Sequence, residues 1–170
     1  MTNNLMVLFP GNRYTAAHPL LYYAHLKYER KGYQVIRINY GSFNTIDEAK
    51  SSALAQIKEI DFTIYDDIVF ISKSMGTVIA GEIAETLSTS VRHVYLTPLE
   101  DTLRFIKYGE NISIVIAGTK DPYMDAHILK EHCEQEKIKP ELIEDADHSL
   151  EVSDDADINI DILKRIVDFY

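Results

Sequence analysis

Short apolar runs rich in β-branched residues alternate with longer amphipathic segments throughout this sequence. The clearest runs cover residues 5–9, 67–72 and 91–96, and the turn-forming residues Pro10-Gly11-Asn12 follow the first of them. Such runs are typical of parallel strands buried on both faces, because crossover helices cover the sheet on each side. The pattern therefore predicts an α/β fold with a parallel sheet between two layers of helices.

These runs predict six strands, at residues 5–9, 34–40, 67–72, 91–96, 113–117 and 141–144. Helices are predicted at residues 19–31, 46–60, 75–87, 122–137 and 158–169. The second helix follows a capping box formed by Thr45 and Glu48, and Pro122 is expected to open the fourth. No repeat, low-complexity tract or linker interrupts the pattern, so we expect a single domain over residues 1–170.

The chain carries a formal net charge of −10, with its acidic residues spread along the sequence. This charge argues against nucleic acid or an anionic membrane as a partner. Cys133 is the single cysteine, which excludes an internal disulfide and is typical of a reducing compartment. The apolar run at residues 5–9 is too short for a signal peptide or a membrane span. We therefore expect a soluble, cytoplasmic protein with no membrane partner.

The segment Ser72-Lys73-Ser74-Met75-Gly76 joins a strongly apolar strand to an amphipathic helix. Ligands of parallel sheets bind beyond the carboxyl ends of the strands, where this segment lies. A serine in a sharp strand-to-helix turn exposes its hydroxyl, and the residues two before and two after it must be small, as Ser72 and Gly76 are. Ser74 is thus a candidate nucleophile. The alternative interpretation is that Ser74 only caps the following helix.

Two further candidate residues follow later strands. Asp121 comes after the strand at 113–117 through the turn Gly118-Thr119-Lys120, and His148 comes after the last strand. Each has a simpler interpretation, Asp121 as a helix N-cap and His148 as a solvated loop residue. With Ser74, however, they follow strand ends in the order Ser, Asp, His, which is the order of nucleophile, acid and base in one hydrolase architecture.

Backbone N–H groups near Ser74 are candidates for stabilising a negatively charged oxygen. The N–H of Met75 lies at the start of a helix, which favours negative charge. After the first strand, Gly11 allows a sharp turn that lets the N–H of Asn12 or Arg13 face the serine. We expect Met75 and one of these two residues to form an oxyanion hole.

The sequence resembles the α/β-hydrolases over nearly its whole length. The similarity rests, in order, on residues 5–12, 32–36, 73–76, 117–122 and 147–149. It is greatest to small members without a lid, including dienelactone-hydrolase-like proteins and small bacterial serine hydrolases. The resemblance implies the α/β-hydrolase fold with a minimal six-stranded parallel sheet, because the chain starts at the strand before the oxyanion turn.

The resemblance also implies a triad of Ser74, His148 and Asp121. Some family members take the acid from the end of the preceding strand, which makes Asp101 a rival to Asp121. Ser72 stands where the family usually has the first glycine of the elbow, and Thr77 stands where a further glycine is common. Neither difference removes a group of the expected triad.

Residues 100–111 lie where the family often inserts a lid. This segment is too short for a helical cap domain, and at most one short helix is expected, at residues 102–108. The site should therefore be shallow and open. The candidates for its walls lie near strand ends and are Tyr14, Phe43, Leu99, Phe105 and Tyr123.

No motif in the sequence indicates a metal or another cofactor. H-E-x-x-H, Walker A and G-x-G-x-x-G strings are absent, and the other histidines lack metal-ligand spacing. Cys133 lies on a predicted helix, where we expect it to be packed rather than reactive.

We therefore expect a serine hydrolase that cleaves a small-molecule carboxylic ester or thioester through an acyl-enzyme intermediate. Two alternatives stay open, namely a non-catalytic binding protein with a hydrolase fold and an acyltransferase. The sequence does not separate esters from thioesters, amides or lactones, nor does it give the oligomeric state.

Overall fold

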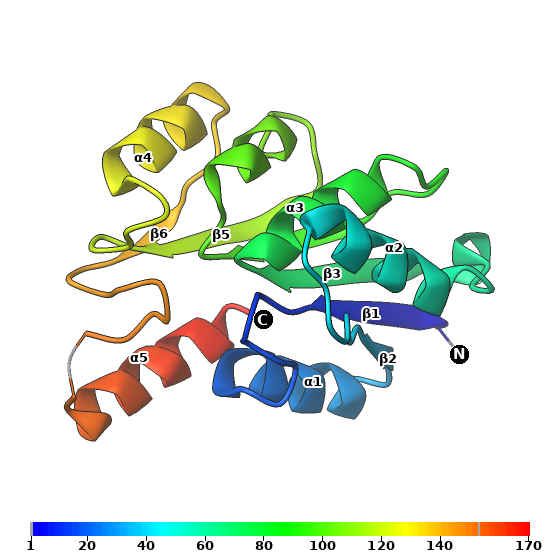
Figure 1. Ribbon diagram of the computed structural model, residues 1–170, viewed down its shortest axis with the longest axis horizontal. Helices are drawn as coiled ribbons and strands as arrows, with labels where there is room; N and C mark the ends of the chain where they lie inside the picture. Colours follow the sequence, from blue (N-terminus) through cyan, green and yellow to red (C-terminus); the bar gives the residue numbers. More distant parts are fainter. Residues whose placement is uncertain (1, 153) are drawn as a thin grey trace.

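A six-stranded sheet, with every strand parallel to its neighbours, forms the centre of the computed structural model, which describes residues 2–152 and 154–170 (Figure 1). The strands are β1 (Asn4–Phe9), β2 (Gln34–Arg37), β3 (Asp67–Lys73), β4 (Arg92–Leu96), β5 (Ile112–Gly118) and β6 (Glu141–Ile143). Their order across the sheet is β2-β1-β3-β4-β5-β6. The predicted all-parallel sheet of six strands is confirmed.

Helices cover both faces of the sheet (Figure 1). Helices α1 (Pro19–Arg30) and α5 (Ala156–Asp168) lie on one face, and α2 (Ile46–Ile57), α3 (Met75–Ala84) and α4 (Ala126–Gln135) lie on the other. Short 3-10 helices occur at η1 (Phe62–Ile64) and η2 (Glu100–Phe105). Among the residues that the structure describes, no helix has the length and hydropathy of a bilayer span.

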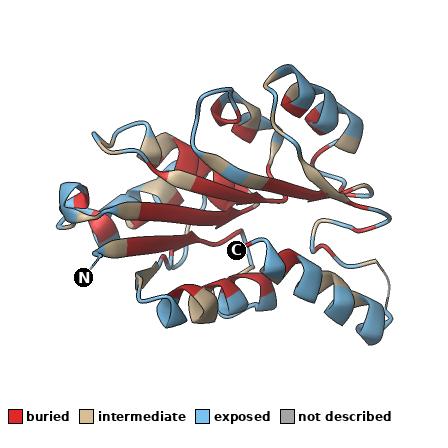
Figure 2. Ribbon diagram, turned by 180° about the vertical axis from the view of Figure 1, so that it is seen from behind, coloured by how far each residue is buried: buried red, intermediate tan, exposed pale blue. Residues whose placement is uncertain are grey.

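The core consists of two layers that share the sheet. Along β1, Leu5, Val7 and Phe9 pack with α2 and α3, whereas Met6 and Leu8 pack with α1 and α5. This alternation follows from the two-residue period of a strand. Figure 2 shows the result, with the strands buried and the outer sides of the helices exposed.

Several predicted boundaries are wrong, and the structure gives the reason for two of them. Strand β2 ends at Arg37 instead of residue 40. The last hydrogen bond between β2 and β1 runs from the Ile38 N–H to the Leu8 carbonyl. The next bond would need a backbone N–H from Pro10, which proline lacks. Helix α4 begins at Ala126 instead of Pro122, because the Asp125 carboxylate accepts from the N–H groups of the first turn. Helix α3 ends at Ala84, three residues before the predicted end.

The segment between β4 and β5 contains only the 3-10 helix η2, at Glu100–Phe105 instead of residues 102–108. All residues of this segment are described, and they form no cap domain. The sheet therefore ends at its carboxyl edge in loops, without a lid over them.

Candidate active site

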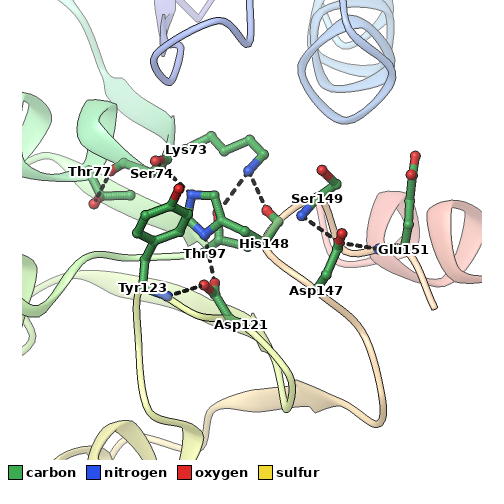
Figure 3. Close-up of polar contacts among 10 residues, drawn as sticks. All are labelled: Lys73, Ser74, Thr77, Thr97, Asp121, Tyr123, Asp147, His148, Ser149 and Glu151. Carbon is green, nitrogen blue, oxygen red and sulfur yellow. Dashed lines mark hydrogen bonds and ion pairs between the residues drawn. The ribbon is translucent and has the colours of Figure 1, made fainter. Parts of the chain in front are cut away.

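The candidate residues meet at the carboxyl edge of the sheet. Strands β2 and β3 lie on opposite sides of β1, so the chain reverses its direction across the sheet at this point. Such a reversal opens a crevice between the loops that follow the strands. Ser74 follows β3, Asp121 follows β5 and His148 follows β6, and Figure 3 shows their side chains side by side.

Ser74 occupies a sharp turn between β3 and α3. Its backbone has φ 53° and ψ −126°, a conformation that a non-glycine residue rarely adopts. A methyl group on Gly76 would lie 2.3 Å from the Phe9 carbonyl oxygen, so only glycine fits there. Ser72 is fully buried and donates its hydroxyl to the Val94 carbonyl at 3.3 Å. The Ser74 side chain makes no capping bond to α3, so the interpretation as a simple helix cap is wrong.

The three candidate side chains form one chain of hydrogen bonds. The distance from His148 Nε2 to Ser74 Oγ is 2.8 Å, and that from His148 Nδ1 to Asp121 Oδ2 is 2.7 Å. With Asp121 ionised, Nδ1–H donates to the carboxylate, which leaves Nε2 to accept from the serine hydroxyl. The arrangement can therefore remove a proton from Ser74.

Asp121 is held by its own turn rather than by a helix. Its side chain is fully buried, and its second oxygen accepts from the Tyr123 N–H at 2.9 Å. The Tyr123 ring lies edge-on to the His148 ring, with centroids 4.7 Å apart. Asp125 caps α4 instead, so the N-cap interpretation of Asp121 is also wrong.

The loops that carry Asp121 and His148 pack directly against each other. A methyl group on Gly118 would lie 2.1 Å from the Ala146 carbonyl oxygen, and that oxygen accepts from the Lys120 N–H. Asp147 turns away from the imidazole and accepts from the N–H groups of Ser149 and Glu151. This close contact fixes the spacing between acid and base.

Neither the rival acid Asp101 nor the nearby Asp145 contacts His148 among the described residues. Asp145 forms an ion pair with Lys120, at 2.7 Å. Asp101 is exposed on η2, and no contact joins it to His148 within the described chain. The geometry therefore favours Asp121 over Asp101 as the partner of the histidine.

The turn after β1 lies against Ser74. Gly11 and Tyr14 exchange backbone hydrogen bonds, which puts Asn12 and Arg13 at the tip of the turn. A methyl group on Gly11 would lie 3.1 Å from Ser74 Cβ. In the residues described, the backbone N–H groups of Asn12 and Arg13 have no hydrogen-bond partner. They and the N–H of Met75, the first residue of α3, are the donors available near the serine.

Two open clefts adjoin this turn and share Arg13 and Tyr14. One, of about 540 Å³, lies between the turn and the end of β2, and its walls include Phe43 and Arg37. The other, of about 660 Å³, lies between α1 and α5 and reaches Ser149. Both are within the size range of small-molecule sites.

The five residues expected to line the site differ in where the structure places them. Tyr14 and Phe43 line the first cleft, and Tyr123 contacts His148. Leu99 packs against the core and lines neither cleft. Phe105 was expected at the site, but this is wrong: its ring is buried against Gly81 of α3, where it fills the space left by the missing side chain.

Lys73 was not predicted as a site residue, yet its Nζ donates to the main-chain carbonyl of His148 and to the Thr97 hydroxyl (Figure 3). The sequence feature that could have indicated Lys73 is a charged residue at the end of β3, whose other residues are mostly apolar. Cys133 is buried, as expected, and burial raises the pKa of its thiol to about 11, which makes it a poor nucleophile. The described residues contain no group of three potential metal ligands.

No protein-family model matches the sequence, and a search of curated proteins found no match. Solved structures are similar at low identity. XC6422 from Xanthomonas campestris, described as an α/β serine hydrolase without a lid, has a TM-score of 0.68 and 15% identity, over 99% of this chain and 82% of that chain. The Pyrococcus furiosus esterase Pf2001 has the same TM-score, identity and coverage of both chains.

An α/β serine hydrolase homologue from Coxiella burnetii has a TM-score of 0.69 and 12% identity, over 99% of this chain and 85% of that chain. The similarity in each case extends over nearly the whole of this chain. The chain therefore has the α/β-hydrolase fold, and its structural neighbours include a serine hydrolase described as having no lid.

Proposed function

We propose that this protein is a serine hydrolase that cleaves a small carboxylic ester or thioester through an acyl-enzyme intermediate. The observation that carries the proposal is the continuous hydrogen-bonded chain from Ser74 through His148 to Asp121, with the serine held in a strained strand-to-helix turn. Structural neighbours described as serine hydrolases and as an esterase support the same class of reaction.

In the first half-reaction, Nε2 of His148 takes the hydroxyl proton while Ser74 Oγ attacks the carbonyl carbon. The Asp121 carboxylate holds the imidazole in the required tautomer and stabilises its protonated form. The N–H of Met75, with that of Asn12 or Arg13, binds the oxyanion. The bond to the leaving group then breaks, and the alcohol or thiol leaves with the proton from His148.

In the second half-reaction, water attacks the acyl group on Ser74. His148 takes a proton from this water and returns it to Ser74 Oγ when the acid product leaves. The side chain of His148 is 20% exposed, so water can reach the imidazole without a movement of the fold.

A fluorophosphonate probe tests the nucleophile. We expect it to label the protein at Ser74 alone, because the Ser74 hydroxyl has the His148 imidazole within hydrogen-bond distance and lies beside the proposed oxyanion donors. Ser74→Ala should abolish labelling and lower kcat for a short p-nitrophenyl ester by several orders of magnitude. Labelling that persists in this variant would refute the assignment.

A pair of matched variants tests the acid. Asp121→Asn should lower kcat strongly, because the amide cannot hold the same tautomer of His148, and Asp101→Asn should leave kcat unchanged. His148→Ala should be as damaging as Ser74→Ala, since the two residues act as a unit. If Asp101→Asn lowered kcat strongly and Asp121→Asn did not, the acid would be Asp101 on η2.

A further inference from the structure

A buried lysine lies directly beside the nucleophile. Lys73 is the last residue of β3, immediately before Ser74, and its side chain is 2% exposed. Figure 3 shows its ammonium group between the ends of β3 and β4 and the loop that carries His148. The catalytic mechanism above does not use this group.

The ammonium group has three N–H donors and three partners. Nζ donates to Thr97 Oγ1 at 2.9 Å and to the main-chain carbonyl of His148 at 2.7 Å. It also lies 4.7 Å from the centre of the Tyr14 ring, which is a favourable cation–π contact. These contacts join four segments, namely the serine turn, the end of β4, the turn after β1 and the histidine loop.

Lys73 forms no ion pair with a carboxylate in the part of the chain that the structure describes. Burial lowers the pKa of Lys73 to about 8, although Asp121 and Asp147 attract its charge. A cation in such a place opposes folding, and an apolar side chain of similar length would avoid that cost. The position of the charge is therefore better explained by the site than by the stability of the fold.

We propose that Lys73 is a positioning residue, which holds the main-chain carbonyl of His148 and thereby keeps the imidazole in line with Ser74. The catalytic consequence rests on the proposed function, but the structural consequence does not. His148 belongs to a loop with no regular secondary structure, and Nζ is the donor to its carbonyl oxygen. Proton transfer depends on the 2.8 Å separation between Ser74 Oγ and His148 Nε2. A small displacement of the loop would lengthen this separation and lower the rate.

Lys73→Met removes the charge and the donors while keeping an unbranched side chain. We expect this variant to fold and its kcat for a short p-nitrophenyl ester to fall about 10- to 100-fold with little change in KM. Thr97→Val is the matched control, because it removes one partner of Nζ and leaves the bond to His148. Its kcat should stay within about threefold of wild type, because the bond that holds the histidine loop, from Nζ to the His148 carbonyl, remains in this variant.

The pH profile separates positioning by the ammonium from simple filling of space. The groups that face Nζ are Tyr14 after β1, Asp121 after β5, and Asp147 and His148 after β6. As the pH rises through about 8, Lys73 loses its proton, and we expect wild-type kcat to fall severalfold. Lys73→Met should lack this decrease. Lys73→Arg should have a higher kcat than Lys73→Met and should keep that kcat above about pH 8, because a guanidinium keeps its proton.

Hydrogen–deuterium exchange decides the proposal without reference to activity. We expect faster exchange of the amides of residues 145–151 in Lys73→Met than in wild type, with the strands unchanged. Faster exchange in a protein without hydrolase activity would refute the proposed function and leave the positioning role intact. Unchanged exchange would overturn the positioning role, whatever the effect on kcat.

Discussion

His93 is a buried histidine that plays no part in the site. It lies at the other end of β4 from the serine turn, and its ring is stacked on Tyr95 with centroids 4.9 Å apart. Its Nδ1 atom, the Tyr95 hydroxyl and the Thr89 hydroxyl are buried without a hydrogen-bond partner among the described residues. All three residues line one small cavity of about 220 Å³. Burial lowers the pKa of His93 to about 4.

This shift makes His93 a source of acid instability. Between pH 6.5 and about 4 the unfolded chain binds a proton at this position and the folded chain does not, so the free energy of unfolding falls as the pH falls. The full effect is about 3 kcal/mol. His93→Phe should reduce the loss of stability between pH 7 and pH 4 by up to this amount in urea titrations. Exposed His127→Gln is the control, and an equal reduction in both variants would contradict the assignment to His93.

The candidate triad could be predicted from the sequence because each of its members lies in the segment that follows a strand, and the carboxyl ends of parallel strands meet at one edge of the sheet. The choice of Asp121 over Asp101 needed the structure, since both follow strands and only Asp121 lies at the Nδ1 atom of His148. Lys73 could not be assigned from local pattern. Its partners Thr97 and His148 are 24 and 75 residues away in the sequence.

At the scale of elements, the unit formed by β3, the serine turn and α3 depends on two small residues with different surroundings. Gly76 faces the backbone of β1, which cannot move aside, whereas Ser72 has its hydroxyl on the Val94 carbonyl. The fold therefore accommodates a small side chain at position 72 and none at position 76.

Substitutions at these two positions test that difference. Ser72→Gly should keep kcat/KM within about tenfold, which is about 1.4 kcal/mol in the barrier. Ser72→Val should be much worse, because branching at Cβ presses on the turn and the Val94 carbonyl loses its donor. Gly76→Ala should lower the free energy of unfolding by about 3 kcal/mol and also slow fluorophosphonate labelling. Unfolding titrations and labelling rates measure both effects. A Gly76→Ala variant with unchanged stability and labelling would contradict the close contact between position 76 and the backbone of β1.

The boundaries of elements were harder to predict than their number and order. Apolar runs revealed the strands most clearly where they are buried on both faces, as β1, β3 and β4 are, whereas the edge strands β2 and β6 are only partly buried. The end of β2 depends on which residue of β1 lies opposite it, and the start of α4 depends on whether Asp121 or Asp125 caps it. The first depends on strand register and the second on a contact of Asp121 with a distant histidine, so neither is visible in a local window.

At the scale of the whole molecule, the candidate site lies at the carboxyl edge of the sheet, and no lid from the described part of the chain covers it. The central strands β1, β3 and β4 are buried between the two helix layers, and the triad residues lie in the segments that follow β3, β5 and β6. The segment between β4 and β5 is used to cover α3, with Phe105 on Gly81, and not to cover Ser74. Under the proposed function, we therefore expect an acyl chain on Ser74 to be open to water.

This openness predicts how rate depends on acyl length. Each buried methylene contributes about 0.8 kcal/mol, or about a fourfold gain in kcat/KM, but only while the cleft can enclose it. In the clefts beside Arg13 and Tyr14 we expect the gain to stop after a few carbons, because beyond them the chain extends into solvent. For p-nitrophenyl esters from acetyl to decanoyl, kcat/KM should therefore peak at a short chain and then level off or fall. It should also show no jump when the substrate concentration passes its solubility limit, since no lid exists between β4 and β5 to be opened at an interface. A fourfold increase per methylene that continued to decanoyl would mean that a long apolar tunnel forms in solution, and the open-site interpretation would then be wrong.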